Sequence, residues 1–263
     1  MLWNWIDAHA AWAGLCLVLL GGMGLALYLR SSSAPAFAPM PRPARHILAL
    51  LGLLAGLGLA LMAQDMLCLS QAGGCAARVD WLRFDAWVLQ QLGPYGQEGW
   101  LAPVVWLTQL GHVVWMSVLS AIVLLVLGWR RDWLRAGAWV LGSAGVGLWI
   151  RAIKHAVGRP RPADGLVSEG GFSFPSGHSA GTLVLYCMLA WLLLPHLPRA
   201  WRRPLLLLGL VVALGVGASR VLLRVHFASD VLAGWLLGLA WMALVMGAAE
   251  WANARGRQPG VPA

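Results

Sequence analysis

The sequence predicts an all-α protein, a polytopic bundle of about seven transmembrane helices. Of the 263 residues, 60% are hydrophobic and only 11% are charged, whereas about a quarter of the residues in a soluble domain are charged. Charge-free apolar runs recur along the chain, and a helix of about 20 such residues crosses the hydrocarbon core of a bilayer. Composition and run length together therefore place the chain in a membrane.

Seven apolar runs define the expected spans, at residues 10–29, 47–63, 101–128, 136–150, 179–195, 205–219 and 231–249. The fourth and sixth runs are the shortest, and charged residues follow them: Arg151 and Lys154 after one, Arg220 and Arg224 after the other. If these helices continue for another turn or two, they carry cations into the outer part of the membrane, which is costly unless a polar cavity receives them. Both short spans therefore point to one polar site.

Arginine residues collect in alternate loops, which predicts the orientation of the chain. Because short cytoplasmic loops are rich in Lys and Arg, we expect the cytoplasmic segments to be those that contain Arg30, Arg42 and Arg45; Arg130, Arg131 and Arg135; Arg199, Arg202 and Arg203; Arg255 and Arg257. The N-terminus and the loops at 64–100, 151–178 and 220–230 then face outward, and the C-terminus faces inward. Topology thus explains the net charge of +9. No basic stretch is interleaved with stacking aromatic residues, which argues against nucleic-acid binding.

The N-terminal segment and the cysteines carry two further expectations. No Lys or Arg precedes the first apolar run, so we interpret it as a retained span and not as a secretory signal peptide. Cys68 and Cys75 lie close together in an expected outer loop, where a disulfide can form. A zinc site is not expected there, because no CxxC repeat or His-rich tract accompanies the pair.

Three short motifs lie in two of the expected outer loops: Lys154 followed by Arg161-Pro162; Pro175-Ser176-Gly177-His178; and Ser219-Arg220 followed by His226 and Asp230. Together they resemble the signature of the type 2 phosphatidic acid phosphatase superfamily, Lys-x6-Arg-Pro, Pro-Ser-Gly-His and Ser-Arg-x5-His-x3-Asp. All eleven fixed positions match. The resemblance covers roughly residues 85–249, implies a phosphatase-like membrane domain at 46–253, and leaves an extra span and loop at 1–45 and a short cytoplasmic tail at 254–263.

The same residues suit phosphoryl transfer on chemical grounds. The reaction needs cations or donors around three equatorial oxygens, and Lys154, Arg161 and Arg220 supply the positive charge. Arginine forks bind phosphate through two parallel hydrogen bonds, whereas lysine acts as a point charge. The Ser176 hydroxyl and the Gly177 N–H add neutral donors if this motif opens a helix near residue 179, because a helix N-terminus favours an anion.

Two histidines are expected to divide the catalytic work. His226 and Asp230 are four residues apart, so on a helix they share one face and the carboxylate orients the nucleophilic ring. His178 is then available as general acid for the leaving group and as base for water. The resemblance implies the same roles.

Other ionisable residues are read as structural or topological. Arg151, Arg159 and Arg224 fall outside the signature, and interfacial snorkelling is favoured over substrate contact for each. His112, in the third span, is interpreted as a packed or hydrogen-bonded residue. The acidic residues are dispersed, without the carboxylate cluster of a two-metal phosphatase, so neither a metal nor another cofactor is expected.

The sequence therefore predicts a metal-independent membrane phosphatase of the bacterial inner membrane, acting on a lipid phosphate or diphosphate from the periplasmic side through a phosphohistidine. Candidate substrates are undecaprenyl diphosphate, phosphatidylglycerol phosphate, phosphatidic acid and lipid A. A lipid phosphotransferase using the same site is the first alternative. A transporter or scaffold is disfavoured because the charges collect near one surface and not at mid-membrane, and a vanadium haloperoxidase because seven spans are expected. No feature specifies an oligomeric state.

Overall fold

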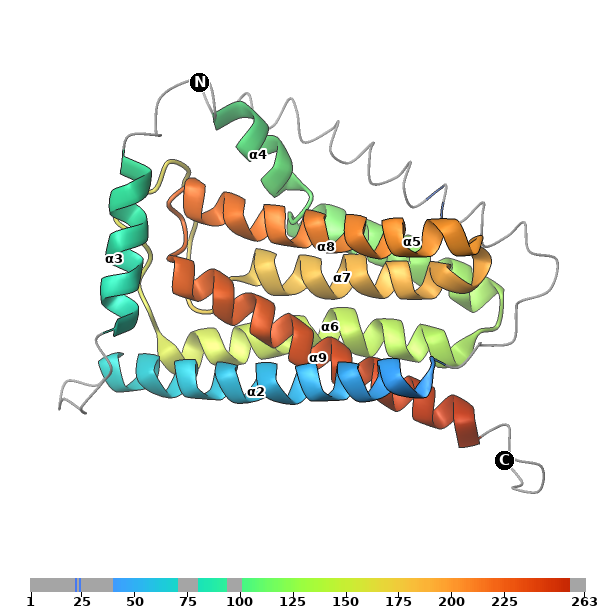
Figure 1. Ribbon diagram of the computed structural model, residues 1–263. Helices are drawn as coiled ribbons and strands as arrows, with labels where there is room; N and C mark the ends of the chain where they lie inside the picture. The colour runs from blue at the N-terminus through green and yellow to red at the C-terminus, as the bar shows by residue number, and fades with distance from the viewer. Residues whose placement is uncertain (1–21, 23, 25–39, 71–79, 94–100, 256–263) are drawn as a thin grey trace.

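The computed structural model describes residues 22, 24, 40–70, 80–93 and 101–255, and these residues form an all-α bundle (Figure 1). Its helices are α2 (Arg42–Ser70), α3 (Asp80–Leu92), α4 (Leu101–Gln109), α5 (Val113–Trp129), α6 (Trp133–Val157), α7 (Gly177–Leu193), the 3-10 turn η2 (Leu194–His196), α8 (Arg199–Leu222) and α9 (Ala228–Arg255). The predicted fold class is confirmed.

Within the described residues, six segments are long and apolar enough to cross a membrane: Arg42–Leu69, Leu101–Trp129, Trp133–Val157, Gly177–His196, Arg199–Leu222 and Ala228–Arg255. They correspond to the second to seventh spans expected from the sequence. The first expected span, residues 10–29, lies outside the described residues except for Gly22 and Gly24. The total of seven spans therefore stays a prediction.

The two short apolar runs belong to longer helices, as expected. The run at 136–150 lies within α6, which extends to Val157 and carries Lys154 in its last turn, and the run at 205–219 lies within α8, which carries Arg220 in its last turn. α6 stops at Gly158, whose φ of 65° is left-handed and whose N–H donates to the Lys154 carbonyl at 2.9 Å. A glycine adopts this conformation without steric cost.

The apolar run at 101–128 does not form one continuous helix, which corrects the sequence-based expectation. α4 and α5 are separated by a turn at residues 110–112, and α4 is inclined to the long helices in Figure 1. A Cβ on Gly111 would lie 2.7 Å from Val216 Cγ1 and 2.8 Å from His178 Cδ2. The chain therefore breaks where its backbone must pass close to α7 and α8, and hydropathy alone does not reveal this contact.

α3 crosses one end of the bundle, roughly perpendicular to the long helices in Figure 1, and was not predicted. It is attached to α2 by a hydrogen bond from Trp81 Nε1 to Asp65 Oδ2 at 3.1 Å. Its one buried residue is Asp85, although apolar side chains are the usual buried face of an amphipathic helix. A buried carboxylate on a helix at this end indicates a polar partner beneath it.

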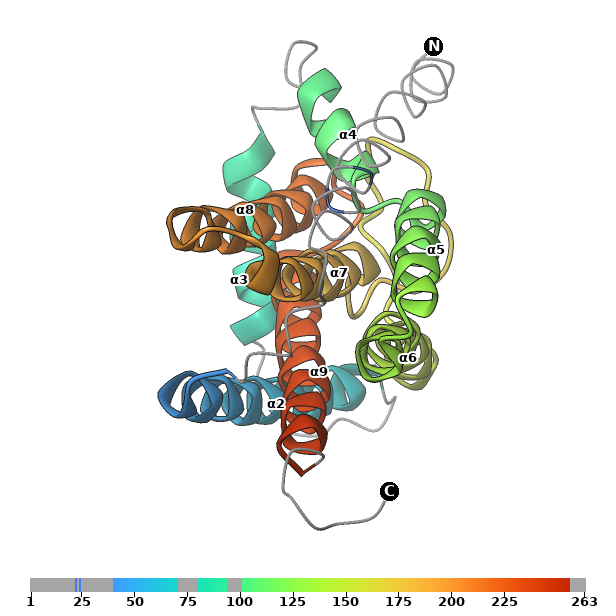
Figure 2. The same cartoon turned by 90° about the vertical axis from the view of Figure 1, so that its right-hand side faces the viewer.

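α7 occupies the centre of the bundle, with α5, α6, α8 and α9 around it in the end-on view of Figure 2. α9 approaches α7 closely because small residues line the contact: a Cβ on Gly234 would lie 2.6 Å from the Ser176 carbonyl, and one on Gly238 would lie 2.9 Å from the Ala180 carbonyl. Small residues at helix contacts let backbones come together in membranes. This close packing brings the first turn of α9 against the start of α7.

Candidate active site

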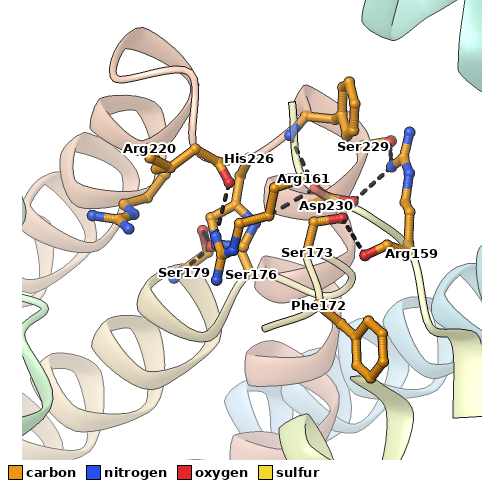
Figure 3. A network of polar contacts seen from close by, with 12 residues as sticks. Arg159, Arg161, Phe172, Ser173, Ser176, Ser179, Arg220, His226, Ser229 and Asp230 are labelled. Atoms are coloured by element: carbon orange, nitrogen blue, oxygen red, sulfur yellow. Dashed lines mark hydrogen bonds and ion pairs between the residues drawn. The ribbon is translucent and has the colours of Figure 1, made fainter. Parts of the chain in front are cut away.

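The three signature motifs meet at the end of the bundle where α6 and α8 finish and where α7 and α9 begin (Figure 3). The structure brings together all eight candidate catalytic and phosphate-binding residues at this end: Lys154, Arg161, Ser176, Gly177, His178, Arg220, His226 and Asp230. Because the helices alternate in direction, motifs that are distant in sequence converge at one bundle end.

His226 and Asp230 form a buried pair. The distance from His226 Nδ1 to Asp230 Oδ2 is 3.4 Å, and the two side chains are 2% and 0% exposed. His226 precedes α9, so the expectation that both lie on one helical face is wrong. Asp230 lies in the first turn of α9, where its Oδ2 also accepts a hydrogen bond from the Phe227 N–H at 2.9 Å. The pairing therefore arises from the turn that starts the helix.

The environment of His226 keeps its ring neutral. Burial lowers the pKa of His226 to about 4, with Asp230 opposing the shift and the positive charges of Arg220 and Arg161 adding to it. His226 Nε2 lies 3.1 Å from Arg161 Nη1. Since arginine only donates, Nε2 presents its lone pair and Nδ1 carries the proton toward Asp230.

Arg159 binds the far side of Asp230, a role that was not expected from the sequence. Its Nη1 donates to Asp230 Oδ1 at 2.6 Å and to Ser229 Oγ at 2.7 Å, and its Nη2 donates to Asp85 Oδ2 at 2.7 Å. Arg159 is 9% exposed and its guanidinium lies 4.1 Å from the centre of the Phe227 ring. The interpretation of Arg159 as an interfacial anchor is therefore wrong: it is a buried partner of a signature carboxylate.

Asp85 completes this network from α3. It accepts hydrogen bonds from the Ser229 N–H at 2.8 Å and from Ser229 Oγ at 2.6 Å, across 144 sequence positions. The sequence offered a weak signal for Arg159, which is two residues before signature Arg161, but none for Asp85. Burial of both charges is tolerated because each is paired and hydrogen-bonded.

The three expected phosphate-binding cations contact the loop between α6 and α7. Lys154 Nζ donates to the carbonyls of Phe172 and of Ser173, the latter at 3.1 Å. Arg161 donates to the carbonyls of residues 170 and 171 at 3.0 to 3.2 Å. Arg220 forms an ion pair with Glu169, a residue that lies outside the three sequence motifs.

Ser176 caps the N-terminus of α7, which begins at Gly177, close to the expected start. Its buried hydroxyl accepts from Ser179 Oγ at 3.0 Å, and its own N–H donates to the Asp230 carbonyl at 2.9 Å. Just inside the helix, His178 lines a cavity of about 380 Å³ together with Arg220, Glu169 and His112. An open space therefore joins the second histidine to Arg220, one of the expected phosphate-binding residues.

Comparison with known proteins agrees with this geometry. The family model described as the PAP2 superfamily matches residues 133–254. A phosphatidylglycerophosphatase B of Bacillus subtilis (strain 168) is 35% identical over 159 residues, which cover 57% of this chain and 76% of the relative. The chain belongs to the PAP2 superfamily. An undecaprenyl-diphosphatase of Sulfolobus acidocaldarius is 36% identical over a shorter stretch of 86 residues, 33% of this chain and 34% of that protein.

A solved structure extends the similarity of this PAP2 protein to the fold. The crystal structure of a transmembrane PAP2 type phosphatidylglycerolphosphate phosphatase from Bacillus subtilis matches with a TM-score of 0.63 and 25% sequence identity, covering 80% of this chain and 98% of the other. The family resemblance is thereby confirmed, and the chain is a multi-span membrane protein whose relatives are PAP2 lipid phosphatases.

Three other residues considered in the sequence lie around the PAP2 site: Arg224, Arg151 and His112. Arg224 forms an ion pair with Asp164 at 2.5 Å rather than extending freely into the interface. Arg151 lines an apolar groove beside His178, and His112 caps α5 by accepting from the Val114 N–H at 3.4 Å. The reading of His112 as a hydrogen-bonded residue is confirmed.

Two other sequence predictions stay open. Cys68 lies in the last turn of α2 and is disulfide-bonded. Cys75 lies outside the described residues, so its pairing with Cys68 remains a prediction. Among the described residues, no group of three or more His, Cys, Asp or Glu side chains is arranged to hold a metal ion. Hydrolysis without a metal likewise stays a prediction.

Proposed function

We propose that this PAP2 protein hydrolyses a lipid phosphate or lipid diphosphate through a phosphohistidine on His226. The observation that carries the proposal is the environment of that ring: a neutral, buried imidazole with its proton toward Asp230 and its Nε2 lone pair beside Arg161. A neutral nucleophile with an orienting carboxylate is the arrangement that covalent catalysis requires.

In the first step, the Nε2 lone pair of His226 attacks phosphorus and the bond to the leaving oxygen breaks. Lys154, Arg161 and Arg220 neutralise charge on the equatorial oxygens, which is the main source of catalysis in phosphoryl transfer. Arg161 must turn its Nη1 donor from His226 to a phosphate oxygen, which frees the lone pair for attack. Asp230 stabilises the positive charge that develops on the ring.

His178 is the proposed proton carrier in both steps. His178 lines the same cavity as Arg220, so a phosphate bound to Arg220 in this cavity would lie close to the His178 ring. In the first step the imidazolium form of His178 gives its proton to the departing lipid oxygen, which leaves the ring neutral. In the second it removes a proton from water, the hydroxide oxygen bonds to phosphorus, and the phosphorus–Nε2 bond breaks. Inorganic phosphate leaves and both histidines return to their starting states.

An apolar groove supports a lipid substrate that approaches from the side. The groove has a volume of about 480 Å³ and lies between α5, α6 and α7, with walls that include Met116, Leu124, Ile150 and Leu185. His178 lines both this groove and the polar cavity. An acyl or prenyl chain in the groove would thus leave its terminal phosphate near the histidine, since apolar pockets with a few convergent polar groups are the usual form of a ligand site.

Two substrates are favoured by the names of the relatives, phosphatidylglycerol phosphate and undecaprenyl diphosphate; phosphatidic acid and lipid A remain candidates from the sequence. We place the protein in a bacterial inner membrane with the site facing the periplasm. The arginines at 130–131 and 199–203 lie at the bundle end opposite the site, which supports this orientation under the positive-inside rule.

The test is phosphate release by purified protein from a panel of these four lipids, beside His226→Ala. Release by the wild type alone supports the proposal. Phosphate recovered on an added lipid acceptor instead of in solution would favour the phosphotransferase alternative. No reaction with any lipid, in protein that retains its thermal unfolding transition, would contradict both.

A further inference from the structure

One short segment, Glu169–Ser173, contacts all three expected phosphate-binding cations in this structure. Glu169 pairs with Arg220, the carbonyls of Gly170 and Gly171 accept from Arg161, and those of Phe172 and Ser173 accept from Lys154. A bound phosphate needs the same donors. A phosphate that binds through these donors exchanges these contacts for contacts with its own oxygens.

Glu169 is the member of this segment that carries charge. Its Oε1 accepts from Arg220 Nη2, and its Oε2 lies 3.9 Å from Arg161 Nη2. Its side chain is 31% exposed and lines the cavity of about 380 Å³ that also contains His178. Carboxylate and phosphate oxygens bind arginine forks in the same way, so the Glu169 carboxylate occupies a position that suits a phosphate.

The Glu169 carboxyl is ionised, so it can be compared with an anionic phosphate. Burial raises the pKa of its carboxyl, but the charges of Arg220 and Arg161 and the hydrogen bond from Arg220 outweigh burial and hold the pKa below its usual value. Arg220 is 2% exposed and its other terminal nitrogen donates to Thr108 Oγ1 at 2.8 Å. One terminal nitrogen of Arg220 is thus held by Thr108, and the other is covered by Glu169.

The backbone beside Glu169 has room to move. Gly171 has a φ of 71°, and a Cβ built on Gly170 or on Gly171 would meet nothing within 4 Å. Two consecutive glycines in open space leave little packing to hold the segment in one conformation. The backbone next to Glu169 can therefore change conformation without a side-chain clash at these two glycines.

We propose that Glu169 is a specificity-determining residue, an internal anion that competes with the substrate's phosphate for Arg220. This inference rests on the proposed function. A terminal phosphate monoester carries a charge of about −1.5 to −2 at neutral pH and displaces the carboxylate. A phosphodiester headgroup carries a single negative charge and competes less well. Glu169 thereby keeps the abundant phosphodiester lipids of the membrane out of the site, and it favours the departure of inorganic phosphate.

The test is the variant Glu169→Gln, which removes the charge and keeps the size of the side chain. Asp164→Asn is the matched control, because Asp164 is an acidic residue of the same loop that pairs with Arg224 and is 56% exposed. Binding of orthovanadate and of inorganic phosphate is measured by titration calorimetry in detergent. We expect Glu169→Gln to bind both anions on the order of tenfold tighter than wild type, and Asp164→Asn to stay within about twofold.

A competition assay tests the specificity directly. Vesicles of phosphatidylglycerol, a phosphodiester lipid, should inhibit hydrolysis of a lipid phosphate by Glu169→Gln more strongly than hydrolysis by the wild type. Unchanged or weaker anion binding by Glu169→Gln would overturn the inference and show that Glu169 holds Arg220 in place. The inference would also be overturned if neither the wild type nor any variant bound orthovanadate or inorganic phosphate.

The calorimetric measurement does not depend on turnover, so it tests this inference separately from the proposed function. Tighter anion binding by Glu169→Gln in a protein that hydrolyses no lipid phosphate would support the competition and contradict the hydrolase. Glu169→Asp, which retains the charge, should bind orthovanadate less tightly than Glu169→Gln. A reversed order would contradict a role for the charge.

Discussion

The guanidinium of Arg159 and the carboxylate of Asp230 form a buried ion pair, with 2.6 Å between Nη1 and Oδ1, on the opposite side of the carboxylate from His226 (Figure 3). The two oxygens of Asp230 thus have separate partners: Oδ1 contacts Arg159, and Oδ2 faces the histidine ring. Asp85 binds the second terminal nitrogen of Arg159 at 2.7 Å. The orientation of the proposed nucleophile therefore depends on α3, a helix outside the signature motifs.

The first prediction concerns Asp85→Asn, which weakens the hold on Arg159 without creating a cavity. By analogy, loss of an outer partner of a metal-binding histidine typically lowers activity by about 10- to 100-fold. We expect kcat to fall in this range while orthovanadate affinity stays unchanged, because Asp85 contacts Arg159 and Ser229 and not the proposed phosphate-binding cations. Steady-state kinetics and calorimetry check both quantities. Arg224→Gln is the control, and an equal loss there would mean that the effect is not specific to the Asp85 contact.

The sequence indicated the members of the candidate site that lie in the three motifs, because fixed spacings single them out without knowledge of the fold. It missed Asp85, Glu169 and the role of Arg159, since ion pairs between distant segments leave no periodic pattern in one chain. The break between α4 and α5 was missed for a similar reason. Hydropathy records the polarity of residues 101–128, whereas the break depends on the close approach of Gly111 to Val216 and His178.

A second prediction tests the proposed nucleophile. His226→Ala should abolish both turnover and the phosphoenzyme, because no other group is expected to form the covalent bond to phosphorus. Asp230→Asn should slow phosphoenzyme formation by about 10⁴-fold, by analogy with the loss of an orienting carboxylate in serine proteases. Labelled substrate and rapid quenching in alkaline denaturant measure the covalent phosphate. Label on His178 in the His226→Ala protein would contradict the assignment.

The pH dependence of kcat/KM follows from the neutral state of His226. Burial lowers its pKa from the ordinary 6.5 to about 4, so the lone pair stays available through the range in which an exposed histidine becomes protonated. On lowering the pH, the loss of kcat/KM that is due to His226 should therefore occur near pH 4 and not near 6.5. The kcat/KM of the wild type and of Asp85→Asn is measured over the same pH range. An acidic limb near 6.5 that remains after correction for the ionisation of the substrate's phosphate, whose second pKa is about 6, would contradict the buried, neutral ring.

Metal dependence provides a fourth prediction. Because three fixed cations surround the phosphate in the proposed mechanism, excess EDTA should leave phosphate release unchanged within about twofold, and orthovanadate should inhibit by taking the geometry of phosphorus under attack. Phosphate release is measured before and after dialysis against the chelator. Complete loss in EDTA, restored by added magnesium, would show that charge stabilisation comes from a metal.

The last prediction separates the two histidines by their order of action. His178 lines the cavity beside Arg220 and also the apolar groove, which suits a proton carrier between the phosphate and its leaving group. Protonation of the leaving oxygen matters little for an aryl phosphate with an acidic leaving group, so His178→Ala should still form phosphohistidine from such a substrate. Clearance should be slow, by about 10²- to 10⁴-fold, because the base that activates water is missing. Rapid-quench experiments should then show phosphoenzyme accumulating in His178→Ala to a higher level than in wild type. Absence of phosphoenzyme in His178→Ala, in protein that binds orthovanadate normally, would instead assign His178 a necessary part in the attack on phosphorus.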